Sequence, residues 1–224
     1  MESVKQKINE ADLELEVLPV YNEIINKPEI IEALNLLDSL PKNLFYHNKN
    51  HTLDVIKETI LFAIADNANL ETIETQAIAD AWHDVGHTKR SKDHESIGVE
   101  IFKESEAYKN MSKRQRDEIV ASIIDTQIII KNGKPSFNKK RNTYGYILDA
   151  DVSNFGRKDY FEKGELVAKE AGLDLSDNET KKKFLNFAVE LLKNHEWKTN
   201  SAKILRQEQK EINLQQSEKI LGQL

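Results

Sequence analysis

The sequence predicts an all-α domain, and three observations lead to this fold class. Glycine and proline, which interrupt helices, occur only 8 and 4 times in 224 residues. Apolar residues recur at the three- and four-residue spacing of amphipathic helices in several segments. No internal repeat or low-complexity linker divides the chain. We therefore expect a single compact helical domain over residues 1–224, with no sheet of consequence.

The first half of the chain divides into three helical stretches. Residues 9–38 are expected to form one or two helices, which Pro19 and Pro28 punctuate. A helix is expected over 43–65, where apolar residues recur at helical spacing. After Asn69, the stretch 70–87 has an apolar side along its length and a glycine near its end, which is typical of a helix that finishes there.

The second half continues the helical pattern after one loop. Helices are expected over 94–105 and 112–130. Residues 131–143 carry glycine, proline, asparagines and five basic residues, which predicts a loop. This loop is either a solvated connection or a mobile lid that meets phosphate. Residues 144–156 return to helix, and 178–224 read as two final helices joined by a polar turn.

Composition and charge narrow the function classes. The net charge of −6 disfavours a protein that coats nucleic acid, which would show a basic face, yet it leaves room for a small phosphorylated ligand. The absence of cysteine excludes disulfides, thiolate zinc sites and cysteine nucleophiles. The polar first residues do not resemble a signal peptide, and no apolar run approaches the ~20 residues that span a bilayer. We expect a cytoplasmic location, with no membrane or nucleic-acid partner.

The spacing of the histidines is the most informative local feature. His47 and His51 are four residues apart, which on a helix places both rings on one face. His83, Asp84 and His87 form a second group with the same spacing between its imidazoles. A carboxylate beside imidazoles suits divalent ions such as zinc, manganese or iron. Each pair alone is commonly a surface coincidence, so the metal hypothesis depends on their combination.

Further polar residues have open roles. Asp149 and Asp151 are expected near a helix start, and either could supply a distal carboxylate. Asp80, one turn before Asp84, is either an acceptor that orients a ligand histidine or a surface carboxylate. His94 follows basic residues and is either a contact to phosphate or a second metal, or part of a solvated loop. One more histidine is expected in the core or at its boundary: His195, in line with apolar residues of a late helix.

Taken together, these residues resemble the HD-domain superfamily of metal-dependent phosphohydrolases, whose pattern is a His, a His-Asp pair and a distal Asp. More narrowly, YHNKNHTLDV at 46–55 resembles the YHNxxHxxDV signature of class I cyclic nucleotide phosphodiesterases. HDVGH resembles their HDxDH, with Gly86 in place of Asp, and DVSNFG resembles their DxSNP, with Phe155 in place of proline. The matches span 46–156, and the chain's size is closer to that of small bacterial members with the same signature.

The resemblance implies an HD-type domain with its metal-site core at about 44–156 and C-terminal helices at about 178–224. It also implies a role for each matching residue. One divalent ion would be held tightly and a second less so; zinc, manganese, magnesium and iron are the candidates. The implied ligands of the tighter ion are His51, His83, Asp84 and Asp151, with Asp84 bridging to the second ion. His47 would be the general acid, His87 would lie near the second ion's water shell or the substrate phosphate, and Glu95 would accept a hydrogen bond behind the ligands.

The implied reaction is hydrolysis of a phosphoester by a metal-bridging hydroxide, with His47 protonating the leaving oxygen. The expected substrate is a small phosphorylated molecule, a nucleotide or cyclic nucleotide phosphodiester above all, although Gly86 and Phe155 leave the substrate type open. The alternatives are a nucleotide phosphomonoesterase, a di-iron oxygenase of the HD type with His87 and His94 as added ligands, and a non-catalytic nucleotide sensor. The C-terminal helices could pack on their own domain or on a second copy, so a homodimer is an open alternative.

Overall fold

The computed structural model describes residues 10–137 and 144–224. Within them the chain is mostly helical, as predicted, with one small hairpin. The elements are α1 (Glu10–Ile24), α2 (Pro28–Leu37), α3 (Lys49–Ala65), α4 (Leu70–Trp82), the 3₁₀ helix η1 (Val85–Thr88), α5 (His94–Glu104), α6 (Glu106–Asn110), α7 (Lys113–Asp125), β1 (Ile128–Lys131), β2 (Lys134–Phe137), α8 (Tyr146–Ala150), the 3₁₀ helix η2 (Ser153–Gly156), α9 (Tyr160–Glu170), α10 (Asn178–Asn194) and α11 (Asn200–Leu221).

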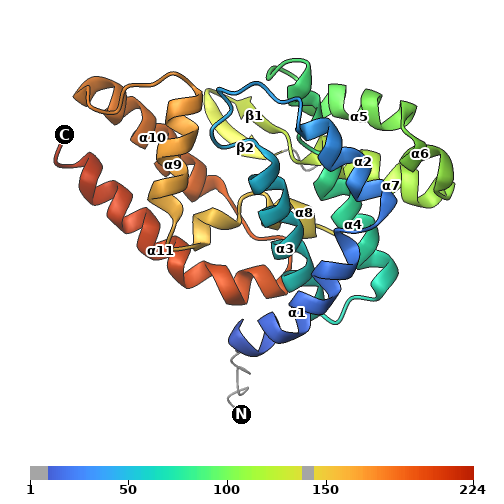
Figure 1. Cartoon of the computed structure of the whole chain (residues 1–224). Coiled ribbons are helices and arrows are strands. Elements are labelled where there is room, and N and C mark those ends of the chain that lie inside the picture. Colours follow the sequence, from blue (N-terminus) through green and yellow to red (C-terminus); the bar gives the residue numbers. More distant parts are fainter. Residues whose placement is uncertain (1–9, 138–143) are drawn as a thin grey trace, which may run out of the picture.

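Helix α3 is the central element of this arrangement (Figure 1). It packs against α1, α4 and α8. Helices α2 and α4–α7 lie on one side of it, and α9, α10 and α11 lie on the other. The short hairpin β1–β2 lies between these two groups and contacts α10. None of the helices in the described ranges is both long enough and apolar enough to cross a membrane.

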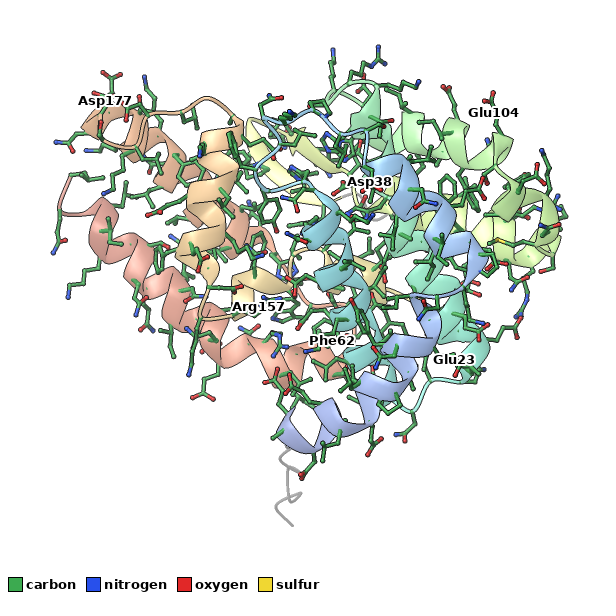
Figure 2. All side chains as sticks on the ribbon, viewed as in Figure 1. Glu23, Asp38, Phe62, Glu104, Arg157 and Asp177 are labelled. Carbon is green, nitrogen blue, oxygen red and sulfur yellow. The ribbon has the colours of Figure 1, made fainter. Side chains whose placement is uncertain are left out.

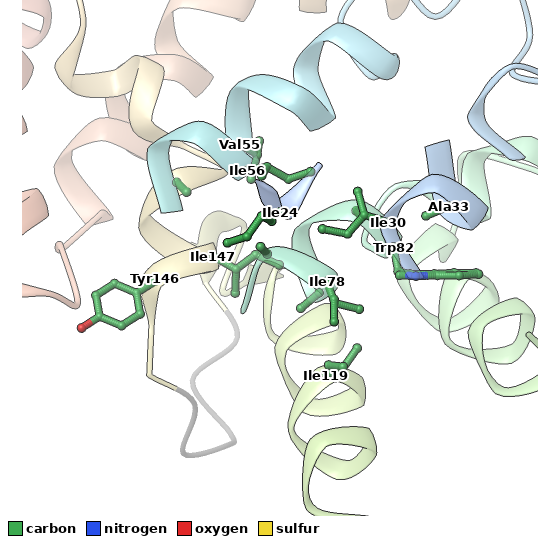
Figure 3. Packing of buried hydrophobic residues seen from close by; sticks show 14 of the residues in the cluster. Ile24, Ile30, Ala33, Val55, Ile56, Ile78, Trp82, Ile119, Tyr146 and Ile147 are labelled. Atoms are coloured by element: carbon green, nitrogen blue, oxygen red, sulfur yellow. The ribbon is translucent and has the colours of Figure 1, made fainter. Parts of the chain in front are cut away.

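The main core forms where α3 and α4 meet their neighbours. Figure 3 shows Val55 and Ile56 of α3 close to Ile24 of α1 and Ile147 of α8, with Trp82 of α4 further along the same cluster. All five side chains are at most 2% exposed. Burying an aliphatic side chain of this size contributes about 1.5–3 kcal/mol, so this cluster fixes α3 and α4 relative to each other. Charged side chains such as those of Glu104 and Asp177 point outward, while Phe62 lies among the helices (Figure 2).

A smaller apolar cluster covers the segment after α8. Val152, Phe155, Tyr160, Leu191 and Leu192 pack together where η2 meets α9 and α10. Trp197 contacts both this cluster and the main core. The two clusters therefore meet beside the stretch that carries Asp151.

Several predicted elements are confirmed and others are wrong. The first two helices, the helix at 94–105 and the two final helices are present, with bounds close to those expected. The helix expected over 112–130 ends at Asp125, and its last isoleucines form β1, which pairs antiparallel with β2. Five residues of the expected loop 131–143 are therefore in strands, and its Lys139, Lys140 and Arg141 lie outside the described residues. Helices α6 and α9 were not predicted.

Candidate metal centre

His47 lies just before α3 and not on it, which corrects the helical interpretation of the His47 and His51 pair. The side chain of Asn48 accepts hydrogen bonds from the backbone amides of Asn50 (2.9 Å) and His51 (3.4 Å) and so begins the helix. The two rings still lie near each other, with centroids 5.8 Å apart at a steep angle. The N-cap thus separates His47 from the helix while leaving it beside His51.

His83, Asp84 and His87 also lie on a broken segment instead of one continuous helix. Helix α4 ends at Trp82, His83 is its C-cap residue, and Asp84 precedes η1. The chain turns tightly at this point, since His87 N–H donates to the Asp84 carbonyl at 3.0 Å. The turn places the ring of His83 beside one carboxylate oxygen of Asp84 and the ring of His87 beside the other.

Asp151 sits at the C-cap of the short helix α8, which corrects the expectation of a helix start. Its carboxylate oxygen Oδ1 lies 3.1 Å from Nε2 of His51 and 3.5 Å from Nε2 of His83. The neighbouring candidate Asp149 points elsewhere: its carboxylate accepts hydrogen bonds from the backbone amides of Lys198 and Thr199 and from the Thr199 hydroxyl. Asp149 therefore anchors the start of α11, and Asp151 is the carboxylate that reaches the histidines.

The first histidine cluster consists of His51, His83, Asp84 and Asp151. Oδ2 of Asp84 lies 3.2 Å from Nε2 of His83 and 3.7 Å from Nε2 of His51. Nδ1 of His83 is 2.6 Å from the backbone carbonyl of Asp80, and a proton on Nδ1 leaves Nε2 free to bind an ion. Asp80 thus orients the ring of His83 through its backbone carbonyl, and not through its carboxylate as one of the two interpretations expected.

The second histidine cluster uses the other oxygen of Asp84. Oδ1 lies 3.5 Å from Nε2 of His94 and 3.7 Å from Nε2 of His87. The rings of His87 and His94 are stacked, with centroids 3.8 Å apart. Oε1 of Glu95 lies 3.6 Å from Nε2 of His94, and Glu95 is buried. Asp84 therefore presents one oxygen to each cluster, and His94 belongs with His87 instead of with a solvated loop.

The donor atoms of both clusters suit a divalent ion. Each group, His51–His83–Asp84 and Asp84–His87–His94, offers one ligand atom per residue, and these atoms lie within 4.8 Å of one another. His87 is 4% exposed, and neither of its ring nitrogens has a hydrogen-bond partner among the described residues. A buried imidazole without a partner is costly unless an ion or water occupies its lone pair. Imidazole with carboxylate is a donor set for zinc, manganese or iron.

The buried charges of the centre shift the pKa values of its residues in different directions. Burial would lower the pKa of His83, but Asp84 and Asp151 outweigh it and raise that pKa well above its usual range, so an ion that binds this ring competes with a proton. Burial alone would raise the pKa of Asp84, but the adjacent His83 outweighs it and holds that pKa well below its usual range. Burial likewise opposes ionisation of Asp151, yet its contacts with His51 and His83 keep its pKa low. Burial lowers the pKa of His87 to about 4, so this imidazole is neutral at pH 7. Ionised carboxylates and a neutral imidazole are the forms that bind metal.

Glu170 is a site residue that sequence reasoning missed. Its Oε1 lies 2.5 Å from Nδ1 of His47, and its Oε2 accepts from the backbone amides of Tyr46 (2.9 Å) and His47 (3.0 Å). Burial would lower the pKa of His47, but the hydrogen bond to Glu170 outweighs it and raises that pKa. Glu170 is the last residue of α9, 123 positions after His47, and no local signal in the sequence connects the two.

The two clusters open onto a polar pocket of about 330 Å³. Asp84, His94, Glu95 and Asp151 line it together with His47 and the first residues after α7. His195 lies apart: it is 4% exposed and packs against the rings of Phe155 and Trp197, as the core interpretation predicted. The predicted site residues thus meet at one place from four stretches of the chain. They are His47, His51, Asp80, His83, Asp84, His87, His94, Glu95 and Asp151.

The arrangement brings two groups of possible metal ligands together at Asp84, with the imidazole of His47 beside them. Glu170 keeps His47 oriented, and the ring of His47 lies 4.9 Å from that of His87, centroid to centroid. Comparison with known proteins adds no family: no family model, curated protein or solved structure matches this chain.

Proposed function

We propose that the chain is a metal-dependent phosphohydrolase of the HD type. One observation carries the proposal: the two oxygens of Asp84 face two separate groups of imidazoles. His51, His83, Asp84 and Asp151 would hold one divalent ion, and Asp84, His87 and His94 would hold a second. This shared carboxylate supports a pair of ions more directly than either histidine pair does alone.

The chemistry that the ions supply when bound is charge compensation for an anionic phosphoester and activation of a water molecule. The chain's own residues supply orientation and a proton. Asp84 and Asp151 fix the ligand geometry from two distant segments. The hydrogen bond from His47 to Glu170 raises the pKa of this imidazole, which favours its protonated form, and the imidazolium can give a proton to the leaving oxygen. A poor alkoxide leaving group needs that proton.

A second candidate function is a di-iron oxygenase, which the two imidazoles of the second histidine cluster favour. His87 and His94 give this position more nitrogen donors than a water-held second ion would need. Colour and bound iron in aerobically purified protein would support the oxygenase. Colourless protein that contains zinc, manganese or magnesium would support the phosphohydrolase.

The phosphohydrolase is tested with a metal-supplemented panel of cyclic nucleotides, nucleoside monophosphates and a chromogenic phosphodiester, read by mass spectrometry. We expect metal-dependent release of phosphate or a phosphomonoester. Asp84→Asn should abolish both metal binding and turnover, and His47→Ala should keep the metal while losing about 10²–10⁴ in rate.

The matched control is Asp93→Asn. Asp93 lines the same polar pocket but is half exposed and belongs to neither histidine cluster. Its backbone φ of 57° is one that asparagine also tolerates. This variant should keep the wild-type rate. Full activity in Asp84→Asn would contradict the proposal.

A further inference from the structure

A second pocket adjoins the metal centre, on the side of α9 and α10. It has a volume of about 470 Å³ and reaches His47 and Asp151 at its inner end. The polar pocket described above is lined by the same two residues, so the two pockets meet at the metal centre. We call the second one the apolar pocket. A molecule bound in it would be in reach of both the proton donor and the metal ligands.

The walls of the apolar pocket are largely hydrocarbon. Helix α9, helix α10 and η2 supply five aromatic rings to it, together with leucines, a valine and an alanine. The rings are those of Phe155, Tyr160, Phe161, Phe184 and Phe187. Phe155 and Tyr160 are buried at its base, whereas Phe187 is 45% exposed at its mouth. Apolar surface that gathers around an open space favours an apolar ligand.

Polar groups in this pocket are few: the buried tyrosines Tyr46 and Tyr160 carry hydroxyls, and the amide and charged side chains beyond the metal centre lie toward solvent. Among the described residues that line it beyond His47 and Asp151, the side chains with amide or charged groups are Asn154, Glu165 and Lys181. Glu165 is exposed, and Asn154 and Lys181 are partly exposed. The hydroxyl of Tyr160 already interacts with Ser217. A nucleobase with its several donors and acceptors would leave polar edges unpaired here, at about 1–3 kcal/mol for each group. A hydrocarbon group carries no such cost.

The apolar pocket reaches His47, the proposed proton donor to the leaving oxygen. The charged phosphoryl group belongs in the polar pocket, beside the ligand carboxylates and imidazoles, and the organic group of the ester must then leave through the place where the pockets meet. Resting on the proposed function for the location of the phosphoryl group, we infer that the substrate is a phosphoester of a hydrophobic alcohol or phenol, whose organic group fills the apolar pocket. The volume equals that of roughly fifteen water molecules at about 30 Å³ each, so it suits an organic group of on the order of ten to fifteen non-hydrogen atoms.

The inference is tested by binding, using n-alkylphosphonates with chains from methyl to decyl on the manganese-loaded full-length protein. The carbon–phosphorus bond is not hydrolysed, so calorimetry reports affinity without turnover. We expect the affinity to rise by roughly two- to fourfold for each added methylene, which is the range expected for burial of hydrocarbon. Decylphosphonate should also bind more tightly than adenosine monophosphate.

Two variants locate the effect. Ala188→Trp should fill the apolar pocket and remove the dependence on chain length while leaving methylphosphonate affinity unchanged. Asn186→Trp, on the exposed side of the same helix and outside the pocket lining, is its control and should behave as wild type. Phe187→Asn, at the exposed mouth, gives a second variant that disturbs packing little and should weaken only the long chains.

The outcomes separate this inference from the proposed function. An affinity that does not depend on chain length, or tighter binding of adenosine monophosphate than of decylphosphonate, would overturn the hydrophobic substrate while leaving phosphohydrolysis open. Chain-length-dependent binding that Ala188→Trp abolishes would support the apolar pocket even if no ester is hydrolysed. In that case the absence of hydrolysis would count against the proposed function and not against the apolar pocket.

Discussion

The backbone at Gly86 lies directly against the first residue of α5. A Cβ added there would be 1.9 Å from the carbonyl oxygen of His94 and 2.8 Å from the amide nitrogen of Gly98, far below any normal contact. The missing side chain is therefore what allows His94 to stand next to His87 and Asp84. The position that departs from the HDxDH pattern thus has a physical use in this chain.

Gly86→Ala should push α5 away and remove His94 from the second histidine cluster. We expect the affinity for the second ion to fall by at least tenfold, because the ligand geometry is lost, while the first ion is retained. Titration with manganese followed by elemental analysis measures both. Gly164→Ala is the control, since its new Cβ would meet only Phe184 at an ordinary 3.9 Å. Equal metal content in Gly86→Ala and wild type would contradict this role.

The pair of His47 and Glu170 predicts a pH dependence of the reaction. Glu170 raises the pKa of His47, and the pairing lowers the pKa of Glu170 to about 2. A general acid must be protonated, so the rate should fall as pH rises through the pKa of His47. Glu170→Gln removes the charge that favours the imidazolium while burial still opposes it. The alkaline limb of the rate profile should then move to lower pH by about one unit, a change of ~1.4 kcal/mol in the protonation free energy.

The pH–rate profiles of wild type and Glu170→Gln measure this shift. Glu165→Gln provides the matched control, because Glu165 lies on the same helix and its side chain is exposed. Superimposable pH–rate profiles for wild type and Glu170→Gln would show that Glu170 does not act on His47.

The pair of His47 and Glu170 also predicts the sign of a stability change. Because the folded-state pKa of Glu170 is depressed, its contribution is present above about pH 4.5 and is lost as pH falls toward 2.

At the scale of elements, α11 holds the segment that carries Asp151. A Cβ at Gly156 would lie 2.3 Å from the Arg206 carbonyl oxygen, so η2 and α11 are in direct backbone contact. Asn213 donates hydrogen bonds to the carbonyls of Phe155 (2.9 Å) and Arg157 (2.8 Å). These contacts fix the turn that follows Asp151. The C-terminal helix α11 therefore supports the candidate metal centre without contributing one of its proposed ligands.

Glu58 and Arg206 join α3 to α11 by a buried bidentate ion pair, with distances of 2.9 and 3.0 Å. Among the described residues, Glu58→Ala leaves the buried Arg206 with the half-exposed Glu10 as its carboxylate partner, and we expect a loss of about 3 kcal/mol in the free energy of unfolding. Urea denaturation measures it. Lys57→Ala, which removes an exposed neighbouring charge, should change stability by less than about 0.5 kcal/mol. Equal midpoints for Glu58→Ala and Lys57→Ala would contradict the structural role of the pair.

Local sequence signals explain which elements were predicted correctly. A long amphipathic stretch such as α10 shows helical periodicity plainly, because its buried residues are leucines and a valine at helical spacing. The isoleucines after α7 do not, because a short run of β-branched residues fits a helix stripe or a strand equally well, and pairing with β2 decides between them. The Asn48 side chain determines where α3 begins, because it caps the helix. Asparagine can cap a helix or lie within one, and the spacing of His47 and His51 does not distinguish the two.

At the scale of the whole molecule, the candidate site depends on contacts that no local pattern contains. The histidine groups were predicted from their spacing and Asp151 from the resemblance of DVSNFG to a family motif, and the structure brings them together across about one hundred residues. Glu170, on a helix that was not predicted, and the adjoining apolar pocket emerge only when α9 and α10 are placed against the centre. Tertiary packing, and not propensity, determines both.

The central claim is that this chain holds two divalent ions through a shared Asp84. The most direct measurement is the metal content of the full chain after chelator stripping, reloading with manganese and removal of the excess. We predict two ions per wild-type chain, one per His94→Ala chain and none in Asp84→Asn, with Asp93→Asn retaining both. Wild-type protein that retains fewer than two manganese ions per chain, or Asp84→Asn that retains as much as wild type, would contradict the claim.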